Sequence, residues 1–422
     1  MSSSVQRRLG TADATVLGLA AMLGTGVFAV WAPAAAAAGP LLLLAVLLAA
    51  IVAACNAAST ADLALAHPGS GGGYGYGRER LGPGAGRLAG VAFLVGKTSS
   101  AAAAAGVFGA YVLPSQPLPA AVLVIVAATV LNVAGVRWTA RGAYALVGGM
   151  LAVLLVVVVI GLLGPDPADV STLAAPDAEA VPGPGGGLGV LTAAALVFFA
   201  FDGYARVAML GEDVREPRRT IRRAVALALG ITLMTYLLVA AALLVGLGTD
   251  RLATEATPLV TVVDAGETSA LGVLVRAGAA VAAGSALLSV LVAASRTALA
   301  MARRGDLPGG LAVVTSRGTP CRADLAGGLV AIGIAALAGP VAAIALSACS
   351  LLVHYAVVNT AALRLAPDER TWSRFTSVLG LLLCVGFAVL LPTRQVLITV
   401  GALAVGWMLC TLLGRGDAPA SG

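Results

Sequence analysis

Long apolar runs restrict this chain to very few fold classes. Twelve segments are apolar over about the 20 residues that an α-helix needs to cross a bilayer, and only 11% of all residues are charged. Inside a membrane the backbone polar groups need partners within the protein, and for runs of this length a helix supplies them. The sequence therefore predicts an all-α integral membrane protein with twelve transmembrane helices, at residues 14–38, 41–66, 87–113, 119–136, 142–164, 188–210, 224–248, 271–301, 323–338, 341–363, 375–391 and 394–413.

The distribution of arginine predicts the orientation. If the N-terminus lies inside the cell, the inner segments hold many arginines, such as Arg78, Arg219 and Arg303, whereas the outer loops hold only Arg251 and Arg394 beside several carboxylates. Cytoplasmic loops of membrane proteins carry such an excess of positive charge. We therefore expect a multi-pass protein of the plasma membrane with both termini cytoplasmic. The net charge of +6 then reflects topology and gives no reason to expect a nucleic-acid partner.

A Gly-Thr-Gly triplet interrupts the first apolar run at residues 24–26. Glycine is the poorest ordinary helix former, so Gly24 and Gly26 around Thr25 favour an opening of the helix. Unpaired backbone groups at membrane depth are tolerated where they line a cavity or bind a ligand, and such a break suits a zwitterionic substrate. The alternative is that the two glycines only let a neighbouring helix approach closely.

The sixth run contains a second interruption, at Asp202 and Gly203 in FFAFDGYAR. With the N-terminus inside, the first run begins at the inner surface and the sixth at the outer surface, so the two interrupted helices have opposite orientations. Matching interruptions in two halves are typical of inverted-repeat transporters and indicate where the substrate binds. We expect a 5+5 inverted repeat, which divides the chain into a cytoplasmic segment (1–13), a first repeat (14–164), an extracellular loop (165–187), a second repeat (188–364), two further helices (365–413) and a cytoplasmic tail (414–422).

Four passages then carry a resemblance to a known family. They are GTGVF at 24–28, PGSGGGYGYGRERLGP at 68–83, FFAFDGYARVAMLGEDVREPRRTIRRA at 198–224 and SRTALAMARRGDLP at 295–308. Together they resemble the amino acid permeases of the amino acid–polyamine–organocation (APC) superfamily. The resemblance implies the leucine-transporter-like fold, in which the substrate binds between broken helices 1 and 6.

The resemblance also implies roles for particular residues around the two interruptions. The backbone of Gly24, Thr25 and Gly26 would bind the substrate carboxylate. Phe201, or a neighbouring aromatic residue, would act as a lid. Carbonyl groups would receive the amino group of the substrate, and they belong to the residues around Ala20, Phe199, Ala200 and Asp202.

Two ionisable residues within the apolar runs are candidates for ion coupling. Some proton-coupled relatives carry a lysine in the fifth helix, but Met150 stands at that position here. Ionisable residues at membrane depth are expensive and usually functional. We therefore predict that Lys97 in the third run and Asp202 lie close together and form a proton-sensitive pair. As one alternative, Asp202 faces the substrate and favours a cationic side chain or an amine. As another, Lys97 reaches toward the inner interface or caps the C-terminus of a neighbouring helix, while Asp202 caps the helix that follows it.

Several other polar residues are weaker candidates. Ser285 and Ser289 in the eighth run could bind a sodium ion, although serines in helices more often bond their own carbonyl groups. His354 and Tyr355 in the tenth run could line the pathway. Arg296 has the position of an interfacial anchor. The five cysteines show no paired spacing, so we expect neither a metal site nor a cofactor.

These features favour a secondary active transporter over an enzyme. The deep polar residues lack the clustering of a catalytic site, and the Walker sequence of an ATP-driven transporter is absent. We expect an alternating-access permease for an amino acid or related amine, working by proton-coupled symport or by exchange. Two alternatives stay open: a non-transporting amino acid sensor on the same scaffold, and an antiporter of polyamines or cationic amino acids. The oligomeric state does not follow from the sequence.

Overall fold

The computed structural model describes residues 9–68, 71–135, 140–164, 186–208, 214–265, 269–316 and 318–413. Within these ranges every regular element is a helix, apart from one isolated bridge between Leu9 and Val214. Most of the predicted outer loop at 165–187 and the tail at 414–422 lie outside the described residues. The elements are α1 (Thr11–Met22), α2 (Gly26–Ala29), α3 (Trp31–Ala38), η1 (Gly39–Leu41), α4 (Leu42–Ala66), α5 (Gly73–Leu81), α6 (Pro83–Val112), α7 (Pro117–Val133), α8 (Ala140–Leu163), α10 (Gly186–Phe201), α11 (Ala205–Ala208), α12 (Pro217–Thr254), α13 (Pro258–Asp264), α14 (Ser269–Arg303), η3 (Gly309–Ala312), α15 (Cys321–Ala362), η4 (Pro367–Glu369), α16 (Arg374–Leu390) and α17 (Thr393–Leu413).

Nine helices of the described ranges are long and apolar enough to cross a membrane, and α7 and α16 are shorter apolar helices. Two of the nine, Trp31–Ala66 and Cys321–Ala362, each include residues of two predicted membrane segments. Helical structure resumes directly after Gly39 in the first and after Gly339 in the second. Both glycines have positive φ, 54° and 67°, and both precede a proline. Proline keeps the residue before it out of the helical region, and glycine adopts positive φ at little cost. The chain therefore leaves the helix one residue before each proline, while the twelve crossings and the 5+5 repeat stay predictions.

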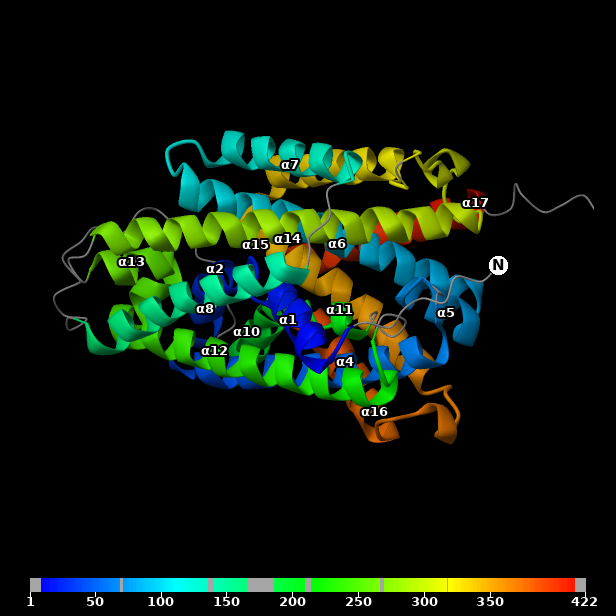
Figure 1. Cartoon of the computed structure of the whole chain (residues 1–422), viewed down its shortest axis with the longest axis horizontal. Coiled ribbons are helices and arrows are strands. Elements are labelled where there is room, and N and C mark those ends of the chain that lie inside the picture. The colour runs from blue at the N-terminus through cyan, green and yellow to red at the C-terminus, as the bar shows by residue number, and fades with distance from the viewer. Residues whose placement is uncertain are drawn as a thin grey trace, which may run out of the picture.

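The outer surface of the bundle is apolar. Leu337, Leu163 and Leu329 are 89%, 82% and 71% exposed, which suits contact with lipid and would be an aggregation hazard in water. The inner helices are covered by the others: 78% of the most apolar window of α6 is buried, against 17% for α17. In Figure 1 the short helices α2 and α11 lie in the middle of the view together with α1 and α10, between α14 and α12.

A buried carboxylate at one end of the bundle ties α5 and α6 to the segment that follows α14. The side chain of Asp306 is 1% exposed and accepts three hydrogen bonds. Its Oδ2 accepts from the Tyr74 hydroxyl at 2.6 Å and from Arg78 Nη1 at 2.7 Å, and its Oδ1 accepts from Arg87 Nε at 2.8 Å. Burial, together with the neighbouring Asp306 carboxylate, raises the pKa of Tyr74, so its hydroxyl stays protonated and acts as a donor.

A second polar contact joins α5 to the loop between α15 and α16. Glu369 Oε1 accepts a hydrogen bond from Arg80 Nη2 at 2.6 Å, and its Oε2 accepts one from the Ala366 N–H at 2.8 Å. These two donors, the backbone N–H first and then Arg80, lower the pKa of Glu369 from its ordinary value of 4.5.

Candidate functional site

The first helix break covers residues 23–25. α1 ends at Met22, and the Leu23 N–H still donates to Leu19 O at 2.7 Å. The N–H groups of Gly24 and Thr25 make no hydrogen bond within the part of the chain that the structure describes. The Thr25 hydroxyl is also without a partner there, although Thr25 is only 4% exposed. Buried donors are rarely left unpaired, so three unpaired donors on two adjacent residues distinguish this break from the interior of a regular helix.

The second break follows α10. The helix ends at Phe201, and Asp202, Gly203 and Tyr204 form a turn before α11 begins at Ala205. The Asp202 and Tyr204 N–H groups reach the carbonyls of Phe199 and Phe201 only at 3.4 Å. The turn is therefore loosely bonded, and it directs the Asp202 carboxylate into the interior, where the residue is 8% exposed.

The two breaks contact each other through their glycines. A Cβ atom at Gly26 would lie 2.4 Å from the Cα of Ala200, and one at Gly203 would lie 2.4 Å from the carbonyl carbon of Ala21. A side chain is excluded at both points because its Cβ would collide with backbone atoms of the other broken helix. The helix therefore opens beside Gly26, and the same residue lets α10 approach closely.

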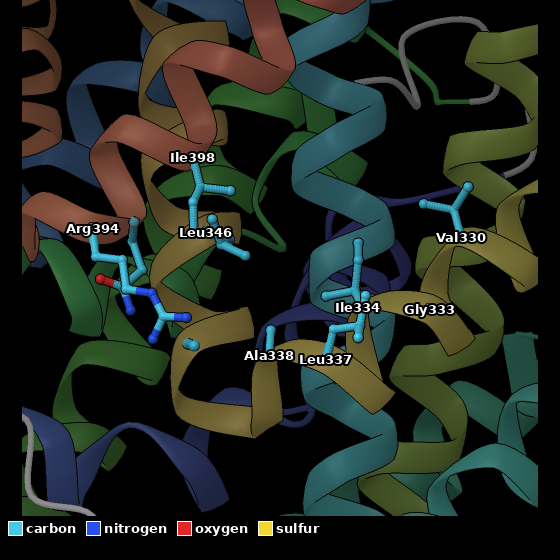
Figure 2. Close-up of a pocket in the computed structure, with 10 residues that line it drawn as sticks. Val330, Gly333, Ile334, Leu337, Ala338, Leu346, Arg394 and Ile398 are labelled. Carbon is cyan, nitrogen blue, oxygen red and sulfur yellow. The ribbon is translucent and has the colours of Figure 1, made fainter.

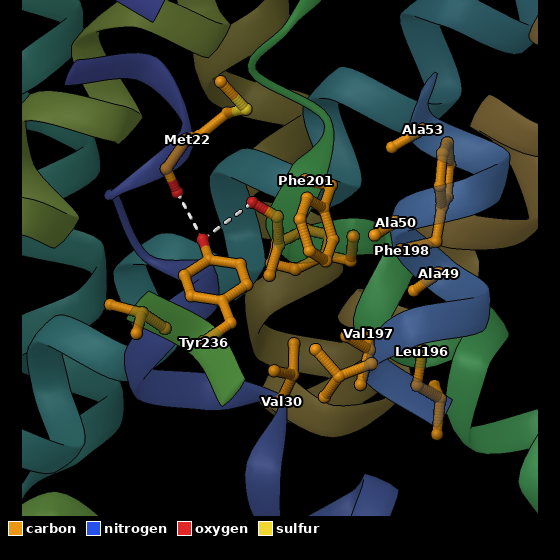
Figure 3. Packing of buried hydrophobic residues seen from close by; sticks show 14 of the residues in the cluster. Met22, Val30, Ala49, Ala50, Ala53, Leu196, Val197, Phe198, Phe201 and Tyr236 are labelled. Atoms are coloured by element: carbon orange, nitrogen blue, oxygen red, sulfur yellow. Dashed lines mark hydrogen bonds between the residues drawn. The ribbon is translucent and has the colours of Figure 1, made fainter. Parts of the chain in front are cut away.

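Tyr236 on α12 forms hydrogen bonds to both broken helices. Its hydroxyl lies 2.6 Å from Met22 O and 3.0 Å from Ala200 O, and one proton serves both carbonyl groups (Figure 3). Phe201 packs against the same ring, with the two centroids 4.9 Å apart. Carbonyl groups freed by the breaks are thus partly satisfied by a side chain from a third helix, as membrane proteins require.

A cavity of about 350 Å³ adjoins both breaks. Its buried part includes Thr25, Lys97 and Asp202, whereas Arg206 and Arg296 are exposed and border its opening. Arg206 lies on α11, and Arg296 lies near the C-terminal end of α14. In the predicted topology both positions are on the cytoplasmic side, where α1 begins. The lining residues are Ala20, Ala21, Met22, Thr25, Gly26, Phe93, Lys97, Ser100, Ala104, Phe199, Ala200, Asp202, Gly203, Ala205, Arg206, Ala286, Ser289, Val290, Ala293 and Arg296.

Lys97 and Asp202 form a buried ion pair on the wall of this cavity. Lys97 Nζ donates to Asp202 Oδ2, and the Tyr355 hydroxyl donates to Asp202 Oδ1 at 2.8 Å. The ammonium also lies 5.4 Å from the centroid of the Phe93 ring. Both oxygens of the carboxylate therefore have protein donors, and Lys97 balances its charge.

The structure brings together most of the residues that the sequence singled out, but not all. Gly24 and Phe201 lie at the breaks without lining the cavity, and Phe201 packs away from it against Tyr236. Ser285 donates within its own helix, to Ala282 O at 2.9 Å, while Ser289 does line the cavity. Three further residues lie off the lining. Met150 is buried in α8, and Tyr355 contacts the cavity wall through its hydrogen bond to Asp202. The third is His354, whose Nδ1 is 2.9 Å from Ala89 O and whose ring lies 5.0 Å from that of Phe93.

Three residues around the two breaks and the cavity were missed in the sequence or given another role there. Arg296 is not only an interfacial residue, because it borders the cavity opening, and Arg206, four residues after Asp202, borders it too. Arg206 Nη1 lies 3.5 Å from Ser289 Oγ. No local signal marked Arg206 for the cavity, because a turn separates it from Asp202, and Tyr236 stands in an apolar run with nothing to mark it.

A second cavity, of about 430 Å³, lies between α15 and α17 and does not suit the same chemistry. Figure 2 shows Arg394 and Ile398 of α17 near the apolar side chains of α15, including Ile334 and Leu337. Leu337 is 89% exposed, so this hollow opens onto the lipid-facing surface. Its size alone therefore does not make it the functional site, whereas the smaller cavity has a buried ion pair and unpaired donors.

Comparison with known proteins identifies the family. The family model described as amino acid permease matches residues 13–416, nearly the whole chain. The chain belongs to the amino acid permease family. An uncharacterized transporter of Mycobacterium tuberculosis is 47% identical to this permease over 407 residues, covering 95% of this chain and 90% of the relative. Two Bacillus subtilis proteins are more distant: a methylthioribose transporter is 27% identical over 79% of this chain and 76% of its own, and the branched-chain amino acid permease BcaP is 26% identical over 74% and 70%.

This membership makes the protein a transporter of the membrane and not an enzyme, as the sequence predicted. The names of the two Bacillus relatives refer to different substrates, a sugar derivative and branched-chain amino acids. The names of these relatives therefore do not indicate which substrate this permease transports.

Proposed function

We propose that this permease is a secondary active transporter that moves an amino acid across the plasma membrane by alternating access, in proton-coupled symport or exchange. The observation that carries the proposal is the buried cavity where two broken helices meet beside the Lys97–Asp202 pair. Half-helix ends at such a point present N–H groups to anions and carbonyl groups to cations. An amino acid has both charges a few ångströms apart.

The first break supplies the donors for the carboxylate end of the substrate. The Gly24 and Thr25 N–H groups and the Thr25 hydroxyl are unpaired within the described residues. A carboxylate accepts several hydrogen bonds at once and binds readily at the N-terminal end of a helix. The substrate carboxylate would therefore sit against the start of α2. The amino group would face carbonyl groups of α1 and α10, with Ala20 and Phe199 on the cavity wall.

The Lys97–Asp202 pair supplies the element that responds to protons. A buried ion pair is stable only while its two charges stay in contact, because removal of one charge leaves the other buried and uncompensated. Protonation of Asp202 would release Lys97 and loosen the turn that joins α10 to α11. Because this turn contacts α1 at Gly203, the change would reach both broken helices. Met150 plays no part in this scheme.

The cavity opening, which the exposed Arg206 and Arg296 border, belongs to one of the two access states. Both arginines lie at the end of the bundle that the distribution of positive charge assigns to the cytoplasm. We therefore assign this conformation to the inward-open side of the cycle. The outward-open state would close this mouth and open the other end of the cavity.

Thermal unfolding of the purified permease tests the proposal. We expect one group of amine-bearing compounds, among the twenty amino acids and common polyamines, to raise the melting temperature, because a ligand that binds only the folded state stabilises it. Asp202→Asn should reduce the shift and lower uptake into proteoliposomes. Ser285→Ala is the matched control, since its hydroxyl bonds within α14 and does not line the cavity. Absence of any shift in wild-type protein would refute amino acid transport.

A separate measurement tests the coupling. Lys97→Met keeps an unbranched side chain but removes the charge, so uptake should lose its dependence on external pH between about 5.5 and 7.5. A pH profile identical to that of the wild type would exclude the pair as the coupling element, without affecting the proposal that the protein transports amino acids.

A further inference from the structure

The charges that line the cavity are unequal. Three cationic side chains, Lys97, Arg206 and Arg296, contribute to the wall, whereas Asp202 is the carboxylate among the lining residues. Asp202 is already neutralised by Lys97 and accepts a second hydrogen bond from Tyr355. It therefore has no uncompensated charge with which to attract a cationic substrate group.

The two arginines are differently placed. Neither has a carboxylate within ion-pair distance in the described part of the chain. Arg296 also lines a small hollow of about 60 Å³ together with Asp324, so a carboxylate lies near Arg296. Arg206 has only the Ser289 hydroxyl, at 3.5 Å from its Nη1. The positive charge that remains available to a ligand is therefore centred on Arg206.

We infer that the site selects an amino acid with a carboxylate in its side chain, which Arg206 binds with Ser289 at its side. This inference rests on the proposed function and names the substrate class of that site. The α-carboxylate lies at the unpaired donors around Thr25, and the side-chain carboxylate extends toward the mouth. An arginine matches a carboxylate with two parallel hydrogen bonds. A cationic side chain at the same place meets like charge without compensation.

The position of Arg206 separates this role from a purely topological one. An arginine that only holds the helix end at the inner surface has no need to border a cavity. Arg206 follows Asp202 by four residues on the short helix after the second break, so it moves with that break. Arg206, which we infer binds the substrate side chain, is thus close in sequence to Asp202 of the ion pair.

Binding of glutamate, glutamine and lysine to the full-length protein tests the inference. Glutamate and glutamine have nearly the same shape, and at pH 7 only glutamate carries the additional negative charge. We expect glutamate to stabilise the wild-type protein against thermal unfolding at lower concentration than glutamine, and lysine to produce no shift. Arg206→Gln should weaken glutamate binding by about 10- to 100-fold, the usual worth of a hydrogen bond to a charged group, and weaken glutamine binding much less, because a neutral amide loses a weaker hydrogen bond.

Two further variants keep the result interpretable. Arg276→Gln removes an arginine outside the cavity, 3.8 Å from Asp264, and should not alter the preference for glutamate. Arg206→Lys retains the charge without the paired hydrogen bonds, so it should keep part of the preference even where Arg206→Gln folds poorly. Glutamine binding as tightly as glutamate, or lysine binding better than either, overturns the inference and leaves amino acid transport standing. Failure of every amino acid to bind overturns both.

Discussion

Replacement of Gly203 by alanine tests whether the two helix breaks depend on their close contact. The new Cβ would lie 2.4 Å from the carbonyl carbon of Ala21 and 2.5 Å from the Met22 nitrogen, whereas ordinary van der Waals contact begins at 3.4 Å. The difference means that α1 and α11 would have to separate by about 1 Å. Because both obstructing atoms belong to the backbone, no side-chain rotation relieves the clash.

The energetic cost follows from overpacking. An extra methyl group forced into a well-packed interior costs about 1–3 kcal/mol. The same displacement moves Asp202, the neighbour of Gly203, relative to Lys97 on α6, and a functional site displaced by about 1 Å loses much of its activity. We therefore expect Gly203→Ala to fold with a lower melting temperature and to lose most of its uptake.

Other glycines provide a graded series of controls. Gly284→Ala adds a methyl group to α14 where nothing lies within 4 Å, so it should be neutral or stabilising by up to about 1 kcal/mol. A Cβ at Gly24 would lie 3.1 Å from that of Ala286, a contact that a small shift relieves. The expected order of damage is thus Gly203, then Gly24, then Gly284.

Thermal unfolding in detergent and uptake into proteoliposomes measure the two effects separately. Wild-type stability and uptake in Gly203→Ala would refute the argument, because α1 and α11 would then have room that the packing denies. Equal losses in Gly203→Ala and Gly284→Ala would also refute it, since the effect would then come from any added methyl group rather than from this contact.

Three further outcomes are expected. Tyr236→Phe should lower stability by about 0.6–2 kcal/mol in a thermal unfolding assay, because two carbonyl groups at the breaks lose their shared donor. Asp306→Asn should cost about 1–3 kcal/mol, since Arg78 and Arg87 lose a charged acceptor, and the matched Asp368→Asn should cost little. The lowered pKa of Glu369 means that its contribution to stability is present above the unfolded pKa near 4.5 and is lost as the pH falls through the lower folded value; Glu369→Gln should remove this acid-dependent component from a pH series of melting temperatures.

The sequence indicated the two helix breaks because glycine acts locally. Gly24 and Gly26, and Gly203 beside Asp202, weaken a helix through their own backbone freedom, so the interruptions were visible without any knowledge of packing. The ionisable residues were equally visible, because a lysine or aspartate in an apolar run stands out against its surroundings. These two local signals pointed to Thr25, Gly26, Lys97, Asp202 and Gly203 of the cavity wall.

Tyr236 and the cavity role of Arg206 required the arrangement of helices in space. Tyr236 is one aromatic residue in a run of apolar residues, and its hydroxyl gains meaning only from Met22 O and Ala200 O on other helices. Arg206 shares its residue type and its end of the bundle with many topological arginines. The lid role of Phe201, or of a neighbouring aromatic residue, came from the family resemblance and stays a prediction; the Phe201 ring packs against Tyr236.

A positive charge can pair with Asp202 from any helix that lies close enough to its carboxylate. A lysine on α8 at the position of Met150 would need to reach the breaks from that helix, whereas Lys97 reaches Asp202 from α6. Since α6 is among the most buried helices and contacts both α14 and α15, its ammonium is shielded from water on several sides. A charge in such surroundings needs a partner, and the Asp202 carboxylate supplies it. We therefore expect that Lys97 can serve the proposed coupling in place of a lysine at the position of Met150, because the carboxylate that it contacts lies at the second break.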